Sequence, residues 1–448
     1  MPDLATIYRA FDAFEPLPAD DDVRYVDLAS VRGSKIAHRL ANRIRMAGDE
    51  PSYHLVMGHT KCGKTTELNR AVRMLREDNY FTVVFDVEEQ ISGRTFEYTA
   101  VLLLMAGSVV AQLQKEKISI KEDSAKKLAE FLISKEITIG GQLSGDMAGK
   151  VEAKVAPGLL VRILGEFGLG IELRGGYQRS RQITTRIEAN TRGFLDVFCE
   201  LMQDAHQQVL EAGYNGLVIV CDGCDKLNLT ATDENGKNRD LQLEMFVDHA
   251  AELQAVPCHV IYTVPISVQA NLGDIWEQSP EFVPAIPVTQ LPDIDEMYSM
   301  EGRQKLTEVV SRRLVQEDTS IEELFQDVNV LEPLIDASGG HISDLLLLIR
   351  DAVLEAQVES EDELAEKHVR VAVRRRLHEY TKLLENKYLE MLVVIDQYKT
   401  ATANSDVYRE LIFKRLVLEY ICGDEIRVDL HPLVAATDAY QRWRKIQG

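Results

Sequence analysis

The spacing of hydrophobic residues divides the first part of the chain into helices and strands. Apolar residues recur at near-helical spacing over 34–47, and a short apolar run follows over 53–57. A glycine-rich stretch then leads into a helix-like pattern over 64–77 and a β-rich run over 80–87. Strand, loop, helix and strand in this order are typical of the start of a parallel α/β sheet.

The same pattern continues to about residue 290. Further strands are predicted over 216–221 and 259–263, and helices over 96–116, 121–135, 180–212 and 241–254. The polar stretch 228–240 predicts a loop. Residues 285–288 predict an edge strand, because prolines are tolerated at the edge of a sheet and not at its centre.

Residues 137–177 differ from the rest of this region. Glycines and small residues alternate with Ile, Leu and Val, which favours a β-hairpin or a flexible arm inserted into the domain. A membrane-active hairpin is the alternative, but charged residues such as Lys150, Glu152 and Arg162 interrupt the apolar positions. We therefore expect a structural ribbon, and the whole insertion of about 118–184 is a candidate partner-binding element.

Beyond residue 291 the pattern becomes helical and highly charged. Helices are predicted over 296–317, 321–327, 330–337, 343–358, 361–376, 376–395 and 404–414. Two alternating strands, 416–421 and 426–430, flank a Gly-Asp turn and predict a hairpin. Helices followed by a hairpin favour a small winged-helix domain at the end of the chain.

Length and charge limit the function classes. In 448 residues, 50 Lys and Arg against 72 Asp and Glu give a net charge of −22. Such an acidic excess argues against a nucleic-acid binder that uses its whole surface, although a local basic patch remains compatible with it. At roughly 150 residues per domain, the length allows about three domains.

Composition also bears on the compartment. No apolar run approaches the roughly 20 residues that span a bilayer, and the acidic start lacks the pattern of a signal peptide. The 6 cysteines are scattered, as is typical of reduced thiols. We expect a soluble, cytoplasmic, multi-domain protein.

Residues 58–65 fit the pattern G-x-x-x-x-G-K-[ST]. Its glycines let backbone N–H groups surround a phosphate at a helix N-terminus, where the helix dipole favours an anion. Lys64 can reach the β- and γ-phosphates of ATP, and the Thr65 hydroxyl can bind Mg²⁺. An ordinary glycine turn is the alternative, but the motif follows a strand and opens a helix. The predicted nucleotide-binding residues here are Gly58, His59, Thr60, Lys61, Cys62, Gly63, Lys64, Thr65 and Thr66.

Asp222 ends the apolar run LVIVC and is the predicted second holder of Mg²⁺, since ligands bind at the carboxyl ends of parallel strands. A strand-end Asp that caps a turn is the alternative. The next acid, Asp225, is predicted either to activate the attacking water or only to cap the turn. Cys221 and Cys224 form a CxxC, but no second Cys or His pair lies at zinc spacing, so packing is favoured.

Thr263 follows the strand HVIY, where a hydroxyl could contact the γ-phosphate or the attacking water. We predict this role over that of a strand-end hydroxyl satisfied by its neighbours.

Together, the segment 58–65, the segment GLVIVCDGCDKL, the strand HVIYTVP, the helical stretch ASGGHISDLLLLIRDA and the terminal helix–hairpin pattern resemble the AAA+/STAND class of P-loop ATPases. The origin-recognition-like branch and related prokaryotic signalling and defence ATPases are the most similar. The resemblance implies an α/β P-loop NTPase with a five-stranded parallel sheet, a helical lid and a C-terminal winged helix. It also implies that Tyr25 to Gly33 form part of an adenine pocket.

The implied domains are a lead segment over 1–50, an ATPase core over 51–290, a lid over 291–375 and a winged helix over 376–448. Lid segments of this class carry an arginine beside the aspartate, where this chain has Ser343 before Asp344; the nearest arginine is Arg350. His341 is a candidate nucleotide contact, with packing at the helix start as the favoured alternative.

Two basic segments remain ambiguous. Arg312 and Arg313 could supply an arginine finger to a neighbouring subunit, but a solvated helical face is favoured. The candidate recognition region 404–415 carries mixed charges. Because a DNA reader is expected to show a basic stripe, protein docking or ATPase regulation is favoured over DNA contact.

The sequence therefore predicts an ATPase that acts as a switch. No residues for a nuclease, protease or other effector chemistry were found, so a separate protein is expected to supply the output, and homo-oligomers are possible partners. A role in prokaryotic defence follows from the resemblance alone. The alternatives are an ATP-dependent DNA-binding initiator or loader, and a nucleotide-bound scaffold with little turnover.

Overall fold

The computed structural model describes residues 3–21, 23–91, 94–133, 187, 190–232, 236–289, 296–400, 405–423 and 425–447. The predicted ribbon 137–177 lies outside the described residues, and so does most of the insertion 118–184. Both stay predictions. The chain forms two compact units: unit 1 comprises Met1–Arg39, Met57–Ala71 and Phe282–Gly448, and unit 2 comprises Leu40–Val56 and Val72–Glu281.

A five-stranded sheet has the strand order β2-β3-β6-β1-β7. Its strands are β1 (Tyr53–Gly58), β2 (Phe81–Asp86), β3 (Leu217–Asp222), β6 (His259–Pro265) and β7 (Glu281–Val283). The pairs β2–β3 and β3–β6 are parallel. Every residue of β3 and β6 is buried, as expected for a parallel sheet covered on both faces. The predicted α/β class with a parallel sheet is confirmed.

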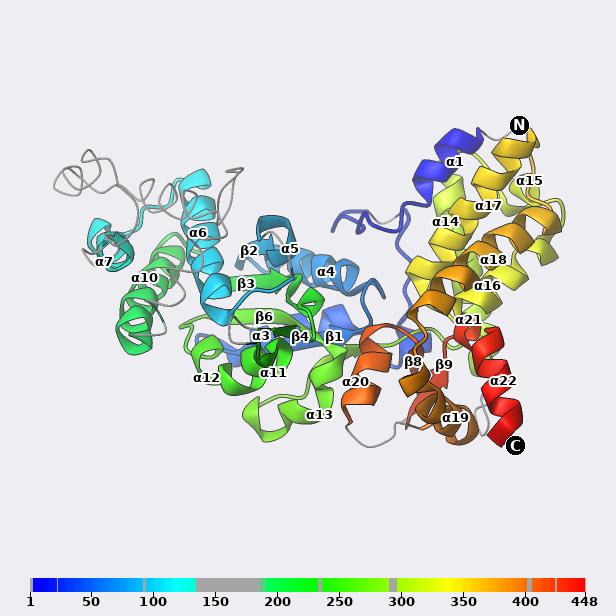
Figure 1. The fold of residues 1–448 in the computed structure, drawn as a ribbon. Helices are drawn as coiled ribbons and strands as arrows, with labels where there is room; N and C mark the ends of the chain where they lie inside the picture. The colour runs from blue at the N-terminus through cyan, green and yellow to red at the C-terminus, as the bar shows by residue number, and fades with distance from the viewer. Residues whose placement is uncertain are drawn as a thin grey trace, which may run out of the picture. The chain divides into compact units, whose positions relative to one another are not determined.

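Helices of unit 2 pack around these strands (Figure 1). The long ones are α6 (Tyr98–Lys115), α7 (Glu122–Ile133) and α10 (Thr191–Glu211); the short ones are α5 (Val87–Gln90), α11 (Leu241–Leu243), α12 (Ala250–Leu253) and α13 (Gln269–Leu272). Helix α6 contacts β2 and β3, and α10 contacts α6 and α7. Because α6 is apolar on most of its sides, it is buried along most of its length.

Two helices each have residues assigned to both units. They are α3 (Ile36–Ala47) and α4 (Lys64–Glu77), both as predicted from the apolar spacing. Helix α4 begins at Lys64, at the end of the glycine-rich loop.

Three predictions in this region are wrong in detail. The predicted loop 228–240 contains a short antiparallel hairpin of β4 (Thr230–Thr232) and β5 (Asn238–Asp240). The predicted edge strand 285–288 is replaced by β7, which ends before Pro284, because proline lacks the N–H that a ladder needs. The predicted helix 241–254 is interrupted by a π-helical turn, Glu244–Asp248, which apolar spacing alone does not distinguish from a continuous helix.

Unit 1 is mostly helical. Its helices are α1 (Leu4–Ala10), α2 (Ala29–Arg32), α14 (Glu296–Val315), α15 (Ile321–Leu324), α16 (Glu332–Ser338), α17 (Ile342–Glu359), α18 (Glu366–Leu383), α19 (Leu389–Tyr398), α20 (Asp406–Phe413), α21 (Pro432–Ala435) and α22 (Asp438–Gln447). Helices α17 and α18 lie side by side (Figure 1). The predicted helix boundary at 376 is wrong: α18 runs through Arg376, since no Gly or Pro interrupts it before Leu384.

Near the end of unit 1, β8 (Val417–Cys422) and β9 (Glu425–Leu430) pair antiparallel, which confirms the predicted hairpin. Helices α19 and α20 precede it, in the predicted order. The assignment of this segment as a winged helix stays a prediction.

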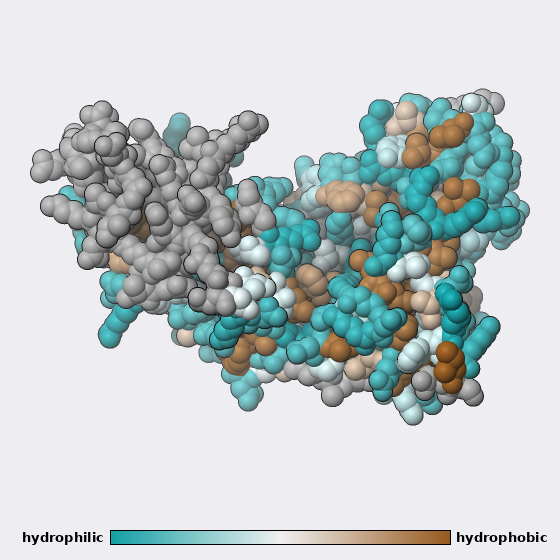
Figure 2. Space-filling model, viewed as in Figure 1, coloured by the Kyte–Doolittle hydropathy of each residue, from teal (hydrophilic) through white to brown (hydrophobic). Residues whose placement is uncertain are grey.

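Hydrophilic residues cover much of the face shown in Figure 2, and hydrophobic residues are scattered among them. The large exposed apolar side chains belong to different elements, for example Met46, Met297, Val358 and Ile446. Across the described ranges, no helix combines the length and the apolar character needed to cross a membrane. The 6 cysteines are free.

Candidate functional site

The loop between β1 and α4 has an unusual backbone. Gly58, Lys61 and Gly63 have positive φ angles of 150°, 67° and 106°. A Cβ atom at Gly58 would lie 2.4 Å from the carbonyl oxygen of Val283, so only glycine fits there. Alternating backbone conformations of this kind turn successive N–H groups toward one point and form an anion-binding concavity. The phosphate site at this loop stays a prediction, and the positive φ angles are the observation that supports it.

Lys64 is buried and turned back onto this loop. Its Nζ donates hydrogen bonds to the carbonyl oxygens of Gly58 (2.9 Å) and His59 (2.8 Å). As the first residue of α4, Lys64 lies at the positive end of the helix dipole, with Thr65 directly after it. The ammonium group and the helix end both favour a phosphate at this loop.

Two buried histidines, one of them within the loop, make contacts with backbone atoms. The Nε2 atom of His59 accepts the backbone N–H of Glu419 (3.0 Å), and Nε2 of His341 lies 3.0 Å from the carbonyl oxygen of Thr60. Nδ1 of His341 accepts the N–H of Asp344 at the start of α17, so Nε2 carries the proton and donates to Thr60. Burial lowers the pKa of both rings, which keeps them neutral. His341 thus caps its helix and contacts the loop backbone.

Arg32 is a loop contact that the sequence analysis missed. Its Nη2 donates to the carbonyl oxygen of Cys62 (2.6 Å), and its Nη1 lies 3.3 Å from Oε1 of Glu67. The side chain is buried, and it lies against Gly63, where a Cβ would be 3.3 Å from Nη2. No local pattern predicts this contact, because it depends on how α2 packs in unit 1.

Tyr25, the predicted adenine-pocket residue, packs against Arg70, whose guanidinium carbon lies 4.2 Å from the ring centroid. Its carbonyl oxygen accepts a hydrogen bond from Arg312 (2.6 Å). Arg313 is buried, and burial lowers its pKa to about 10, so the prediction of a solvated face is wrong for this residue. The adenine pocket stays a prediction.

In unit 2, the tips of β2 and β3 bring acidic residues together. Asp86 and Asp222 are register partners, and Oδ1 of Asp222 accepts the N–H of Gly223 (2.7 Å). Gly223 has a φ of 80°, and a Cβ there would lie 2.2 Å from Oδ1 of Asp86. The space that a second acid would take after Asp222 is therefore filled by Asp86. The sequence analysis missed Asp86, although it also ends an apolar strand run.

Asp86 is paired with a lysine. Nζ of Lys226 lies 3.0 Å from Oδ2 of Asp86 and 2.8 Å from Oε2 of Glu88. Burial alone would lower the pKa of Lys226, but its bonds to Glu88 and Asp86 raise it. Lys226 therefore stays charged and offsets part of the negative charge at the strand tips.

Thr263 and Asp225 belong to the same neighbourhood. The hydroxyl of Thr263 accepts the N–H of Cys224 (3.1 Å) and donates to the carbonyl oxygen of Cys221 (3.4 Å). Asp225 is buried in the turn Cys224–Lys226. Burial raises the pKa of the thiols of Cys221 and Cys224 well above its usual range, so neither is a thiolate that would bind a metal. Both cysteines are buried, which confirms the packing predicted for Cys221.

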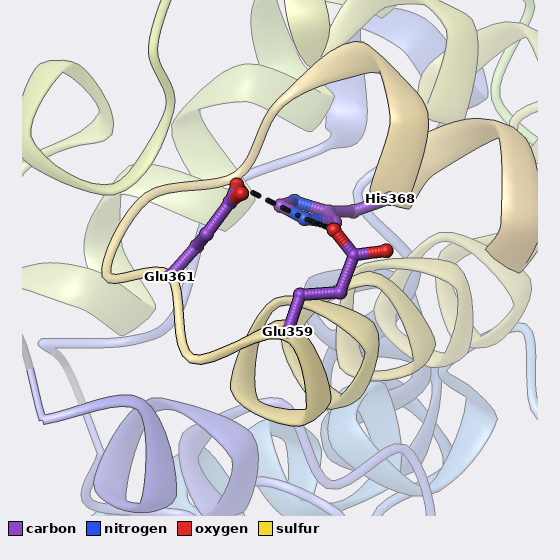
Figure 3. Close-up of side chains that lie close together, drawn as sticks. All are labelled: Glu359, Glu361 and His368. Atoms are coloured by element: carbon purple, nitrogen blue, oxygen red, sulfur yellow. Dashed lines mark hydrogen bonds and ion pairs between the residues drawn. The ribbon is translucent and has the colours of Figure 1, made fainter.

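Within the described part of the chain, one other group of side chains has the composition of a metal site: Glu359, Glu361 and His368 (Figure 3). Nε2 of His368 lies 3.3 Å from a carboxylate oxygen of each glutamate. Its Nδ1 accepts the N–H of Ala365, which places the proton on Nε2, and Lys367 pairs with both carboxylates. The proton and the ammonium group occupy the positions that a cation would need, so this is an ion-pair cluster.

Comparisons with known proteins find a distant similarity. No family model matches the chain, and no curated protein matches it. Among solved structures, a Walker-type ATPase of Pyrococcus abyssi has a TM-score of 0.44 at 12% identity, covering 95% of this chain and 98% of that one. The ORC2 protein of Aeropyrum pernix, in ADPNP–ADP complexes, has a TM-score of 0.40 at 12% identity, covering 98% of both chains. The ORC1 protein of Aeropyrum pernix, in complex with DNA, has a TM-score of 0.37 at 14% identity, covering 94% of this chain and 96% of that one.

All three TM-scores lie below 0.5. The strand order and the backbone of the loop are therefore the stronger observations about this chain: a glycine-containing loop with three residues of positive φ follows β1 of a five-stranded sheet.

Proposed function

We propose that this protein is an ATP-binding, Mg²⁺-dependent P-loop ATPase of the AAA+/STAND type that works as a molecular switch. The observation that carries the proposal is the conformation of the loop that begins at Gly58, with three residues of positive φ and a helix that starts at Lys64. Its amides, the helix dipole and one ammonium group all favour a polyphosphate.

The roles of the site residues follow from this proposal. Gly58 to Thr66 hold the phosphates, and Lys64 offsets their charge. Thr65 and Asp222 provide the oxygen ligands that Mg²⁺ prefers, and the ion, when bound, neutralises charge on the β- and γ-phosphates. Tyr25 borders the adenine.

Asp225 and Thr263 act on the hydrolysis step. In this proposal Asp225 orients the attacking water and Thr263 senses the γ-phosphate. The hydrogen bonds of Thr263 to Cys221 and Cys224 support this assignment, because a shift of its hydroxyl would move the turn that carries Asp225.

The switch is proposed to act on another protein. The domain plan is an ATPase core over 51–290 with a lead segment over 1–50, a lid over 291–375 and a winged helix over 376–448. Nucleotide turnover would change the arrangement of these parts and thereby control an effector, or assembly with further copies of the chain. A role in prokaryotic defence is part of the proposal and rests on the resemblance alone.

The first test is steady-state phosphate release by the full chain, with ATP and Mg²⁺. Lys64→Ala should weaken ATP binding about 100-fold or more, and Asp222→Asn should lower turnover by a similar factor with a smaller effect on affinity. Lys35→Ala removes an exposed lysine of unit 1 and is the matched control. Turnover of the wild type equal to that of Lys64→Ala would refute the ATPase proposal.

The structure disfavours the DNA-binding alternative through the predicted recognition region 404–415. Lys414 pairs with Glu385 (2.7 Å), and Arg409 is buried. These cations are therefore committed to contacts within unit 1. Salt-dependent DNA binding by the full chain tests the alternative, since a fragment cut at 376 would divide α18.

A further inference from the structure

Arg415 is connected to the loop between β1 and α4 through His341, although it is not part of the motif. Arg415 follows Lys414, the C-cap residue of α20, and has a left-handed backbone with a φ of 57°, at the position where a helix more often ends in glycine. A residue with a side chain is disfavoured in this conformation, which Ser360 and Lys399 also adopt at the ends of α17 and α19.

The guanidinium of Arg415 is linked to the loop through one histidine. Its Nη1 lies 3.3 Å from Nδ1 of His341, and the opposite ring nitrogen of His341 donates to the carbonyl oxygen of Thr60 (3.0 Å). The charge of Arg415 also acts on the loop residue His59, whose pKa is lowered first by burial, then by His341 and then by Arg415.

Part of this guanidinium is available for a ligand. The hydrogen bonds that Arg415 makes with the described residues all run through Nη1, and its side chain is 25% exposed. Five N–H donors in a planar fork suit a phosphate, and a single nitrogen is in use here. The group can therefore add a phosphate contact to the bonds it already makes.

The ion pair with Asp344 does not block this role. Besides Arg415, the buried carboxylate accepts a hydrogen bond from the hydroxyl of Tyr380 (3.0 Å) and lies 3.3 Å from Nε2 of His431. Because these donors remain, Asp344 would not be left unpaired if Arg415 turned toward a phosphate.

The arginine that helix α17 itself offers is committed elsewhere. Arg350 lies over the ring of Tyr8, 4.2 Å from its centroid, and 3.6 Å from a carboxylate oxygen of Asp12. Ser343 stands where the resemblance leads one to expect an arginine. Arg415 brings a guanidinium to the first turn of the same helix, next to Asp344.

We propose that Arg415 is a phosphate-contacting residue of the ATP site, supplied by the end of α20 in place of the arginine absent from α17. This inference rests on the proposed ATP-binding function. It gives the segment that contains α20 and β8 a direct contact with the nucleotide, so that this segment senses whether the loop is filled.

The test is isothermal titration of the full chain with ATP and with ADP, in Mg²⁺, for the wild type, Lys64→Ala, Arg415→Met and Arg415→Gln. We expect both Arg415 variants to raise the Kd at least tenfold, in line with the loss of a charge-assisted hydrogen bond. Arg427→Met is the matched control. Like Arg415, Arg427 is an arginine of unit 1 that pairs with one acid, here Glu425, and its side chain is 21% exposed. The Arg427→Met variant should bind ATP with a Kd within twofold of the wild type.

A second readout separates contact from structural support. Removing a cation that touches phosphate should make the Kd rise less steeply with NaCl, whereas loosening of the fold should leave this slope unchanged. Thermal melting without nucleotide shows which variants are folded. If Arg415→Met is unfolded, the ATP affinity of Arg415→Gln is the measurement that tests the inference.

Binding by a folded Arg415 variant within twofold of the wild type, while Lys64→Ala has lost affinity, would overturn this inference and leave the proposed function intact. A wild type that binds no more tightly than Lys64→Ala would instead remove the proposed function itself.

Discussion

The phosphate loop in unit 1 and the tips of β2 and β3 in unit 2 are held in opposite ways. The loop is held by cations and by neutral groups. Lys64 and Arg32 donate hydrogen bonds to its carbonyl oxygens. The rings of His59 and His341 contact backbone atoms, and burial keeps both rings uncharged. The strand tips carry the carboxylates of Asp86 and Asp222. Residues 58–65 include a lysine at the helix start and no acid, which suits an anion, while neighbouring carboxylates suit a cation. The two regions thus have complementary electrostatic character.

The largest effect is expected from breaking the packing of the strand tips. In Gly223→Ala, the new Cβ would lie 2.2 Å from Oδ1 of Asp86, at a φ of 80° that disfavours side chains. Strain and overpacking together should cost about 4 kcal/mol of stability. Urea unfolding followed by the fluorescence of Trp276, which is buried in unit 2, measures this cost in a Trp443→Phe background.

Gly213→Ala is the control for this experiment, because Gly213 has a similar φ of 94° and nothing within 4 Å of its Cβ position. It should lose only the backbone contribution, about 1 kcal/mol. In the double variant with Asp86→Ala, part of the loss at Gly223 should be recovered. Equal losses for the two glycines would show that Asp86 does not fill this space.

These two regions also differ in how far the sequence could predict them. The loop is a contiguous motif between a strand and a helix, so its residues could be identified directly. Asp222 and Thr263 could be identified because each ends an apolar run. Asp86 and Gly223 meet only through the register of β2 and β3, which apolar spacing does not determine.

The remaining contacts and strands that the sequence analysis did not predict have two causes, long-range packing and short elements. Arg415 reaches His341 across 74 positions, and Arg32 reaches Cys62 across 30, so no local pattern could pair them. The strands β4 and β5 have three residues each and are too short to show an alternating pattern. Long elements such as α6 and β3 were predicted well because their burial depends on their own composition.

A smaller effect on stability, and one that depends on pH, is expected at the start of β1, where the neutral side chain of His54 is buried. Burial, and then the charge of Arg43, lowers the pKa of His54 to about 4, and its Nε2 lies 2.9 Å from Oγ of Ser52. As the pH falls below about 6.5, the unfolded chain takes up a proton that the folded chain does not. The stability due to His54 is therefore complete above about pH 6.5 and is lost toward pH 4, by about 3 kcal/mol.

His54→Gln should remove this part of the acid sensitivity. Urea unfolding at pH 7.5 and pH 4.5 should give a difference about 2 kcal/mol smaller in the variant than in the wild type. His38→Gln, at an exposed position, is the control and should leave the difference unchanged. An unchanged difference in His54→Gln would mean that this ring already takes up its proton in the folded state.

Behind the phosphate loop, a buried acid should show the reverse dependence on pH. Burial raises the pKa of Glu419 to about 7, against a partial lowering by the hydrogen bond from Tyr408 (2.7 Å). Below about pH 4.5 the carboxyl is protonated in both the folded and the unfolded chain, so its ionisation does not lower the stability of the fold. As the pH rises from there to 7, the unfolded chain ionises first, so the fold loses stability.

Glu419→Gln should therefore stabilise β8 by about 2 kcal/mol at pH 8 and change it little at pH 5, which is the smallest of these effects. The amide keeps an oxygen for Tyr408, and the backbone N–H that binds His59 is unaffected. Hydrogen exchange of a peptide that covers β8 measures the change at both pH values. A gain of equal size at both would point to packing instead of charge. A gain confined to pH 8 would show that the loop is backed by a group that must stay neutral, as its histidines do.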